Sequence, residues 1–385
     1  MTETRSLLSI YPYYVLYTFS FAKHHAAVMT DVLPTKLRGR GALTNRSGRF
    51  EAASRESFDD GWGMELPERL PTEVLADTSR HVITYNKSPD LGFDRTINPY
   101  RGCEHGCIYC YARPTHAYWG YSPGQDFETK LFVKHDAAAI LKEELTTEKY
   151  QPAIVMLGAN TDAYQPIERE HKITRQVVEV LNRCKHPTGV VTKSALILRD
   201  IDLWAEMADA EIGHITISVT TLDRKLARAM EPRAATPGRR LDAIAKLSEA
   251  GIPVCVNVAP IIPGLTDHEI EPILEAAADA GAAEAAYTLI RLPLEIADLF
   301  QEWLEEHRPD RASRVESLIR QVRGGALYRS NFGERMKGTG PIADLIRQRF
   351  RQASERYGLT KRNTPVRKDL FTRPAKPGQQ FTLGL

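Results

Sequence analysis

Between residues 136 and 306 the sequence alternates short β-rich runs with longer amphipathic stretches, and this alternation restricts the fold more than any other feature. The predicted strands are 153–158, 189–193, 214–221, 253–262 and 285–291, with a further strand at 96–100. The predicted helices are 136–149, 172–183, 200–210, 239–250, 267–280 and 294–306. Six βα units are too few for a closed eight-stranded barrel. We therefore expect an α/β fold, either a partial (β/α)6 TIM-type barrel or an open parallel sheet.

The segments outside this repeat have a different character. Residues 1–30 read as a leader, with Met29 as the expected functional start, and 31–95 as an extended N-terminal arm. The barrel is expected at 96–307, a basic helical extension at 308–372 and a flexible tail at 373–385. The apolar run at 7–21 is shorter than the ~20 residues of a membrane-spanning helix, so no membrane partner is expected.

Three cysteines lie within eight residues of one another, directly after the first predicted strand: Cys103, Cys107 and Cys110. A cuboidal iron–sulfur cluster takes one thiolate per iron, so three ligands leave the fourth iron open to bind a small molecule. Because His105 lies between two of them, a zinc site with three cysteines and one histidine is the alternative. Thiolate ligation of iron implies a reducing compartment, and the cytoplasm is expected.

The spacing C-x3-C-x2-C, with Tyr109 before the third cysteine, resembles the radical S-adenosylmethionine superfamily. The runs at 97–102, 160–168, 192–194 and 259–264 look like its branch related to spore photoproduct lyase. The resemblance implies a [4Fe-4S] cluster and S-adenosylmethionine as cofactors. It further implies reductive cleavage to a 5′-deoxyadenosyl radical that abstracts hydrogen from a substrate, and an electron donor of the flavodoxin or ferredoxin type. Whether such an enzyme is a lyase or an oxidoreductase stays open.

Ligands for the cofactor are expected at the carboxyl ends of the strands, which meet at one mouth of the fold. The hydroxyls among them have a second interpretation, since Ser and Thr often cap helix N-termini. Tyr109 and Cys255 are also candidate catalytic residues, although a small buried core cysteine is the simpler account of Cys255. The candidate cofactor-binding residues are Tyr109, Asn160, Thr161, Asp162, Lys193, Ser194, Ser218, Thr220 and Asn257.

The resemblance breaks down at one position. The lyase carries a cysteine at the end of its second strand that returns hydrogen to the product, and the matching residue here is Ala159. Repair by that route would need Cys184, Cys255 or a tyrosine as the donor. Cys184, at the end of a predicted surface helix, reads as structural.

The chain from residue 308 to 376 contains 18 Lys or Arg against 6 Asp or Glu. A local net charge of +12 suits a polyanionic partner such as nucleic acid. The other interpretation is that these arginines pair with acidic helices elsewhere in the chain.

The last residues resemble the short peptide with which bacterial replication and repair proteins dock on the DNA sliding clamp. The matching side chains are Gln380, Phe381, Leu383 and Leu385; a frayed terminus is the alternative. Three functions follow from the whole sequence. They are a radical enzyme acting on nucleic acid in a DNA-repair-like reaction, a radical enzyme modifying a protein, tRNA or small metabolite, and a non-catalytic, metal-stabilised nucleic-acid-binding protein.

Overall fold

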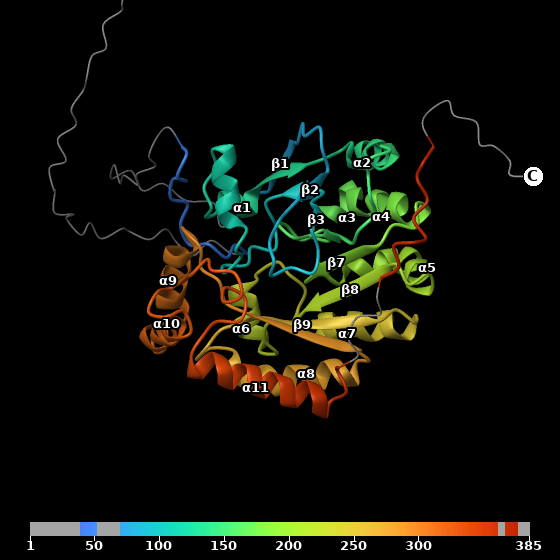
Figure 1. The fold of residues 1–385 in the computed structure, drawn as a ribbon. Helices are drawn as coiled ribbons and strands as arrows, with labels where there is room; N and C mark the ends of the chain where they lie inside the picture. Colours follow the sequence, from blue (N-terminus) through green and yellow to red (C-terminus); the bar gives the residue numbers. More distant parts are fainter. Residues whose placement is uncertain (1–38, 52–69, 361–365, 376–385) are drawn as a thin grey trace, which may run out of the picture. The chain divides into compact units, whose positions relative to one another are not determined.

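The computed structural model describes residues 39–51, 70–360 and 366–375, and a seven-stranded sheet forms its centre (Figure 1). The order across this sheet is β10-β9-β8-β7-β6-β3-β2. The strands are β2 (Ile83–Tyr85), β3 (Arg95–Ile97), β6 (Val155–Leu157), β7 (Thr188–Thr192), β8 (Gly213–Ser218), β9 (Val254–Ile261) and β10 (Glu284–Leu289). All neighbours pair in parallel except β2, which runs antiparallel at one edge. Among the described residues β10 and β2 remain edges, so the sheet is not a closed barrel.

Helices follow the strands in the predicted alternation. They are α1 (Asp126–Thr129), α2 (Ala137–Thr146), α3 (Glu168–His171), α4 (Ile173–Arg183), α5 (Ile201–Asp209), α6 (Arg224–Met230), α7 (Pro237–Glu249), α8 (Ile270–Asp279), α9 (Ile296–His307), α10 (Ala312–Gln321) and α11 (Pro341–Arg356). Short 3-10 helices lie at Arg113–Trp119, Ala195–Asp200 and Asp267–Glu269. Figure 1 shows α4, α5, α7 and α8 on the outside of the strands, with α9 and α10 side by side and apart from them. The five later predicted strands and all six predicted helices are confirmed, with small shifts at their ends.

The strand predicted at 96–100 is wrong at its end. β3 ends at Ile97, and the Asn98 side chain instead accepts a hydrogen bond from the Asn160 amide at 2.9 Å. Tyr100 and Arg101 form β4 (Tyr100–Arg101), which belongs to a second sheet of order β1-β5-β4. The other strands of this sheet are β1 (Glu73–Ala76) and β5 (Lys130–Val133). The chain therefore leaves the main sheet before it reaches the cysteines.

Part of the predicted N-terminal arm packs tightly on the body. The Arg40 guanidinium donates to the carbonyls of Glu128 and Leu70, each at 2.7 Å. The amides of Gly41 and Ala42 donate to the Glu128 carboxylate at 2.8 Å each. The leader with Met29, and residues 31–38 and 52–69 of the arm, lie outside the described ranges.

The basic C-terminal segment continues the helical layer, as the packing of α11 shows. This helix packs on α8 and β10, with the Phe350 ring 4.6 Å from the Tyr287 ring. Arg349 pairs with Glu271 of α8 at 2.5 Å, and Arg335 pairs with Asp90 at 2.6 Å. For Arg335 and Arg349, these pairs support the interpretation in which basic residues of this segment pair with acidic residues elsewhere in the chain.

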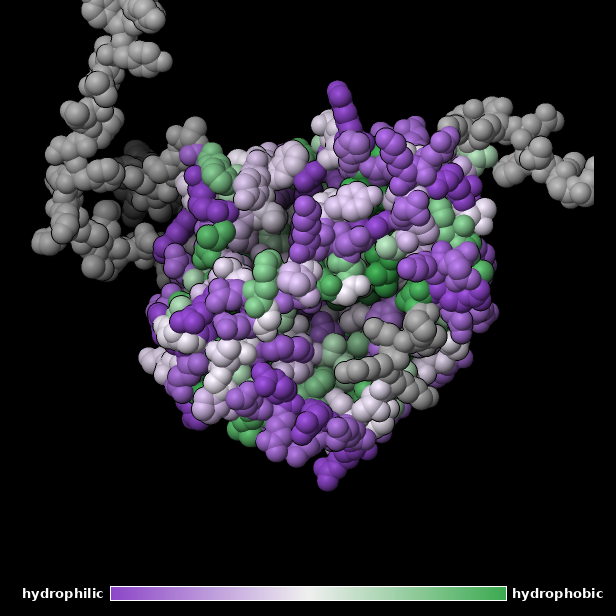
Figure 2. Space-filling model, in the orientation of Figure 1, coloured by the Kyte–Doolittle hydropathy of each residue, from purple (hydrophilic) through white to green (hydrophobic). Residues whose placement is uncertain are grey.

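Hydrophilic side chains predominate on the face shown in Figure 2, and its apolar side chains lie in small, scattered groups. In the described parts of the chain, every helix is too short or too polar to cross a membrane.

Substituting Gly41 should destabilise the protein, because a Cβ at this position would lie 1.9 Å from the Gly106 carbonyl oxygen in the cysteine loop. We expect Gly41→Ala to lower the free energy of unfolding by about 1–3 kcal/mol, measured by thermal or denaturant unfolding. Gly92→Ala is the matched control, since nothing lies within 4 Å of its added methyl group. Equal stability of the two variants would show that this contact is not tight.

Candidate cluster and cofactor site

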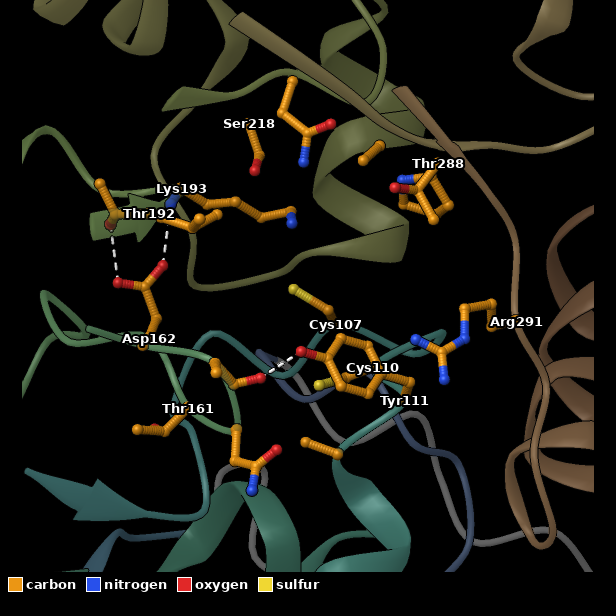
Figure 3. Close-up of a pocket in the computed structure, with 18 of the residues that line it drawn as sticks. Cys107, Cys110, Tyr111, Thr161, Asp162, Thr192, Lys193, Ser218, Thr288 and Arg291 are labelled. Atoms are coloured by element: carbon orange, nitrogen blue, oxygen red, sulfur yellow. Dashed lines mark hydrogen bonds between the residues drawn. The ribbon is translucent and has the colours of Figure 1, made fainter. Parts of the chain in front are cut away.

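A cavity of about 300 Å³ opens at the carboxyl ends of the parallel strands (Figure 3). Cys103, Cys107 and Cys110 all line it. The other walls come from β6 to β10 and the segments that follow β6, β7 and β10, together with Leu91, Phe93 and Met336 from loops elsewhere in the chain. The three cysteines and the strand ends therefore face one shared space, as the sequence predicts.

The cysteine loop is fixed by main-chain hydrogen bonds to other elements. The Cys103 amide donates to the Phe127 carbonyl at 2.9 Å, and the Ile108 amide to the Met230 carbonyl at 3.0 Å. Gly102 and Gly106 have positive φ angles of 72° and 66°, which side-chain-bearing residues rarely adopt.

Arg113, fully buried, anchors the same loop from behind. Its guanidinium donates to the carbonyls of Cys107 at 2.9 Å and Gly106 at 3.1 Å. It also bonds the carbonyls of Pro123 and Gly124 and pairs with the buried Glu128 carboxylate at 2.5 Å. The loop shape is thus set by the fold.

The three thiols fit an iron–sulfur cluster better than a single metal ion. A zinc ion needs its ligands to converge on one point, and within the described ranges no three His, Cys, Asp or Glu side chains do so. A cuboidal cluster binds each thiolate at a different iron, so three sulfurs around one cavity suffice. Burial raises the pKa of all three thiols, a cost that the positive charge of bound iron would offset.

Asp162 is held in place by groups from several elements. Its carboxylate accepts from the Thr192 hydroxyl at 2.7 Å and the Lys193 amide at 2.8 Å, and His105 Nδ1 lies 3.3 Å away. Burial alone would raise the pKa of Asp162, but His105 and these hydrogen bonds lower it to about 2. Both oxygens have protein partners, so Asp162 joins the end of β7 to the cysteine loop.

Thr161 and Tyr109 are also tied to the framework. The Thr161 hydroxyl donates to the Gly102 carbonyl at 2.6 Å. The Tyr109 hydroxyl donates to the buried Glu231, which also accepts from Thr220 at 2.6 Å and pairs with Arg240. Thr161 and Tyr109 line the cavity, whereas Thr220 does not.

Lys193, by contrast, has an ammonium group that lies over the Tyr109 ring. Its side chain extends toward Cys107 (Figure 3), and its Nζ lies 5.7 Å from the centre of the Tyr109 ring. No carboxylate of a described residue lies within salt-bridge distance of this ammonium. Lys193 therefore offers an unpaired positive charge beside the cysteines.

The remaining predicted residues divide into two groups. Asn160, Ser218 and Asn257 line the cavity, with Ser218 and Asn257 opposite one another on β8 and β9. Ser194 and Cys255 lie outside it. Ser194 caps the helix Ala195–Asp200 by accepting from the Leu196 amide at 3.2 Å, which was the alternative interpretation. Cys255 lies two residues before Asn257, deeper in the strand and about 7 Å from it along the chain.

Several residues that line the cavity were not predicted from the sequence. Tyr111 directly follows the third cysteine, and its hydroxyl donates to the Ala159 carbonyl. Arg291 ends the predicted strand 285–291, so its position at a strand end was an available signal. Leu91, Phe93 and Met336 carried no comparable signal, because they come from distant loops. An Asp90–Arg335 ion pair of 2.6 Å and a Gly333 amide bond to Asp90 join these loops.

Comparisons with known proteins agree with this geometry. A family model described as the Radical SAM superfamily matches residues 97–277. The uncharacterized protein Rv2578c of Mycobacterium tuberculosis is 36% identical over 259 residues, which cover 65% of this chain and 76% of that protein. The uncharacterized protein MJ0683 of Methanocaldococcus jannaschii is 29% identical over 197 residues, which cover 51% and 71%.

Solved structures show the same fold at low sequence identity. Spore photoproduct lyase complexed with dinucleoside spore photoproduct matches with a TM-score of 0.56 and 15% identity, covering 74% of this chain and 79% of that one. A point mutant of spore photoproduct lyase, in which a phenylalanine replaces a tyrosine, gives 0.56 and 16%, covering 74% and 80%.

Removing the Arg113 guanidinium should loosen the cysteine loop and leave Glu128 buried without its partner. We expect Arg113→Gln to lower the free energy of unfolding by about 3–5 kcal/mol and to reduce the iron retained after anaerobic reconstitution. Arg113→Lys keeps the charge and should recover part of the stability. Arg367→Gln, in an exposed pair with Asp369, is the control. Unchanged stability and iron content in Arg113→Gln would contradict this role.

Proposed function

The chain belongs to the Radical SAM superfamily and is a radical SAM enzyme, and on that premise we propose that Cys103, Cys107 and Cys110 hold a [4Fe-4S] cluster. Membership of the family implies S-adenosylmethionine, an iron–sulfur cluster and a reductant. The observation that carries the proposal is that three thiols, without a fourth cysteine in the loop, line one cavity together with polar strand ends.

When bound, the cluster supplies the electron that cleaves S-adenosylmethionine to a 5′-deoxyadenosyl radical, which abstracts hydrogen from the substrate. The chain must exclude water and stray hydrogen donors from this space. Apolar side chains from Leu91, Phe93, Met156, Leu289 and Met336 line much of the cavity and serve that purpose.

Polar groups in the cavity suit the functional groups of the cofactor. The Lys193 ammonium suits the methionyl carboxylate, since it lies beside the cysteines without a partner carboxylate among the described residues. The side chains of Asn160, Ser218 and Asn257 provide donors and acceptors for the amino group and the ribose. Asp162, Thr161 and Tyr109 shape the site, because protein groups already occupy their polar atoms.

Nucleic acid is the substrate class we favour, in a DNA-repair-like reaction. The fold likeness to a lyase solved with a dinucleoside photoproduct supports this choice. Return of hydrogen by a cysteine is not supported, because Ala159 lines the cavity at the matching position and, among the described residues, the lining thiols are those of the three cluster cysteines. Two tyrosines, Tyr109 and Tyr111, line the cavity and are the remaining candidate hydrogen-atom donors among the described residues, whereas Cys184 and Cys255 do not line it.

Modification of a protein, tRNA or small metabolite is the second candidate. The internal pairing of Arg335 and Arg349 favours it, because paired arginines contribute less to a surface that attracts polyanions. A flavodoxin or ferredoxin type of protein is the proposed electron donor for either reaction.

Loss of one cluster ligand should abolish the chemistry. Reconstituted protein with dithionite and S-adenosylmethionine is expected to release 5′-deoxyadenosine, and Cys107→Ala should release none and lose iron and sulfide. Cys184→Ala is the matched control, because Cys184 is a buried cysteine at the end of α4, outside the cavity. A colourless wild-type protein that binds one zinc ion, or one that releases no 5′-deoxyadenosine, would refute the proposal.

Docking on the DNA sliding clamp through Gln380, Phe381, Leu383 and Leu385 is a separate proposal, and these residues lie outside the described ranges. A peptide of residues 378–385 should bind purified clamp, and the double change Gln380→Ala with Leu383→Ala should weaken binding by at least about tenfold. Thr382→Ala, at a variable position of the motif, should leave the affinity unchanged. Absence of binding at high micromolar peptide would end this proposal.

A further inference from the structure

A second cation, Arg291, lines the cavity on the side away from Lys193. It follows the end of β10, and Figure 3 shows it beyond Tyr111, as seen from the cysteines. Its guanidinium lies 4.9 Å from the centre of the Tyr111 ring. The buried Nε has no hydrogen-bond partner among the described residues, and Nη1 reaches only the Met336 sulfur, a weak acceptor, at 3.6 Å.

Within the described part of the chain, no carboxylate forms an ion pair with Arg291. The Asp90 carboxylate interacts electrostatically with Arg291, but it already accepts hydrogen bonds from Arg335 and from the Gly333 amide, both at 2.6 Å. The nearby Arg323 donates to the main-chain carbonyls of Glu334 and Ile290, which carry no charge. Burial first, and then repulsion by Arg291, lower the pKa of Arg323. Two arginines thus lie close together while the neighbouring carboxylate is paired with a third.

Arg291 is poorly placed to serve the cofactor carboxylate. Lys193 extends toward Cys107, whereas Tyr111 lies between the cysteines and Arg291 (Figure 3). A buried donor without an acceptor calls for an explanation, and because Arg291 lines the cavity, a bound anionic group can supply the partner that its guanidinium lacks. Tyr111, whose ring centre lies 4.9 Å from the guanidinium, and Met336, whose sulfur lies 3.6 Å from Nη1, provide aromatic and apolar surface next to the charge.

We propose that Arg291 binds a phosphodiester of the nucleic-acid substrate and positions the adjoining nucleotide at the cavity mouth. This inference rests on the proposed function. A planar guanidinium with parallel N–H groups matches two phosphate oxygens. An aromatic and apolar surface beside it suits the face of a base, as in single-strand recognition generally. Arg291 would therefore be a substrate-positioning residue of the cavity.

The test compares two dinucleotide probes that differ in one charge. Thymidylyl-thymidine carries an ordinary phosphodiester, and its methylphosphonate analogue has nearly the same shape without the negative charge. Binding of each to the reconstituted protein with S-adenosylmethionine is measured by calorimetry. The wild-type protein should bind the charged probe at least about tenfold more tightly, Arg291→Gln should bind both equally, and Arg291→Lys should retain part of the preference. Arg351→Gln, an exposed position on α11, should keep the full preference.

Equal binding of the two probes by the wild-type protein, no binding of either, or a full preference in Arg291→Gln would overturn the inference. Because these are binding measurements, they are separate from release of 5′-deoxyadenosine by the wild-type protein. Failure of that release would count against the proposed function, and failure of the charge preference against the phosphodiester contact.

Discussion

The buried ion pair between Arg113 and Glu128 holds together the parts of the chain on which the site depends. Both side chains are fully buried, so two charges are removed from water at a large cost in free energy. Their mutual attraction offsets this cost only if hydrogen bonds also satisfy the remaining polar atoms of both groups. Here that condition is met: Arg113 donates to four main-chain carbonyls, and Glu128 accepts from the amides of Gly41 and Ala42. The pair therefore connects the N-terminal arm, the cysteine loop and α1.

Two further buried carboxylates repeat this arrangement on other sides of the cavity. Asp162 accepts hydrogen bonds from residues at the end of β7 and lies close to His105. Glu231 accepts hydrogen bonds from Tyr109 and Thr220 and pairs with Arg240. In each case a carboxylate with several donors ties the cysteine loop to a strand end. The acidic groups of the framework are thus occupied, while Lys193 and Arg291 remain as the cavity cations without carboxylate partners among the described residues. This imbalance suits a site that takes an anionic group on each side of the cysteines.

The periodic part of this fold was predictable from the sequence, because the short apolar strands β6 to β10, several of them buried along most of their length, alternate regularly with amphipathic helices. The second sheet was not, since β1, β4 and β5 are two to four residues long and show no period of their own. The cysteines were predictable because their spacing is local. Arg113, Glu128 and Glu231 were not, because a buried charge is recognisable only once its distant partners are known. Ser194 shows the limit of strand-end reasoning, because its side chain caps a helix. Cys255 is buried outside the cavity, in line with its alternative interpretation as a core cysteine.

We propose that three thiolates hold a cluster whose fourth iron binds S-adenosylmethionine. Electron paramagnetic resonance of the dithionite-reduced, reconstituted protein, with and without added S-adenosylmethionine, is the most direct test of this ligation. We expect the signal of a reduced four-iron cluster and a clear change in its g-values when S-adenosylmethionine is added, because the cofactor would ligate the open iron. A four-iron signal that S-adenosylmethionine leaves unchanged would refute this ligation.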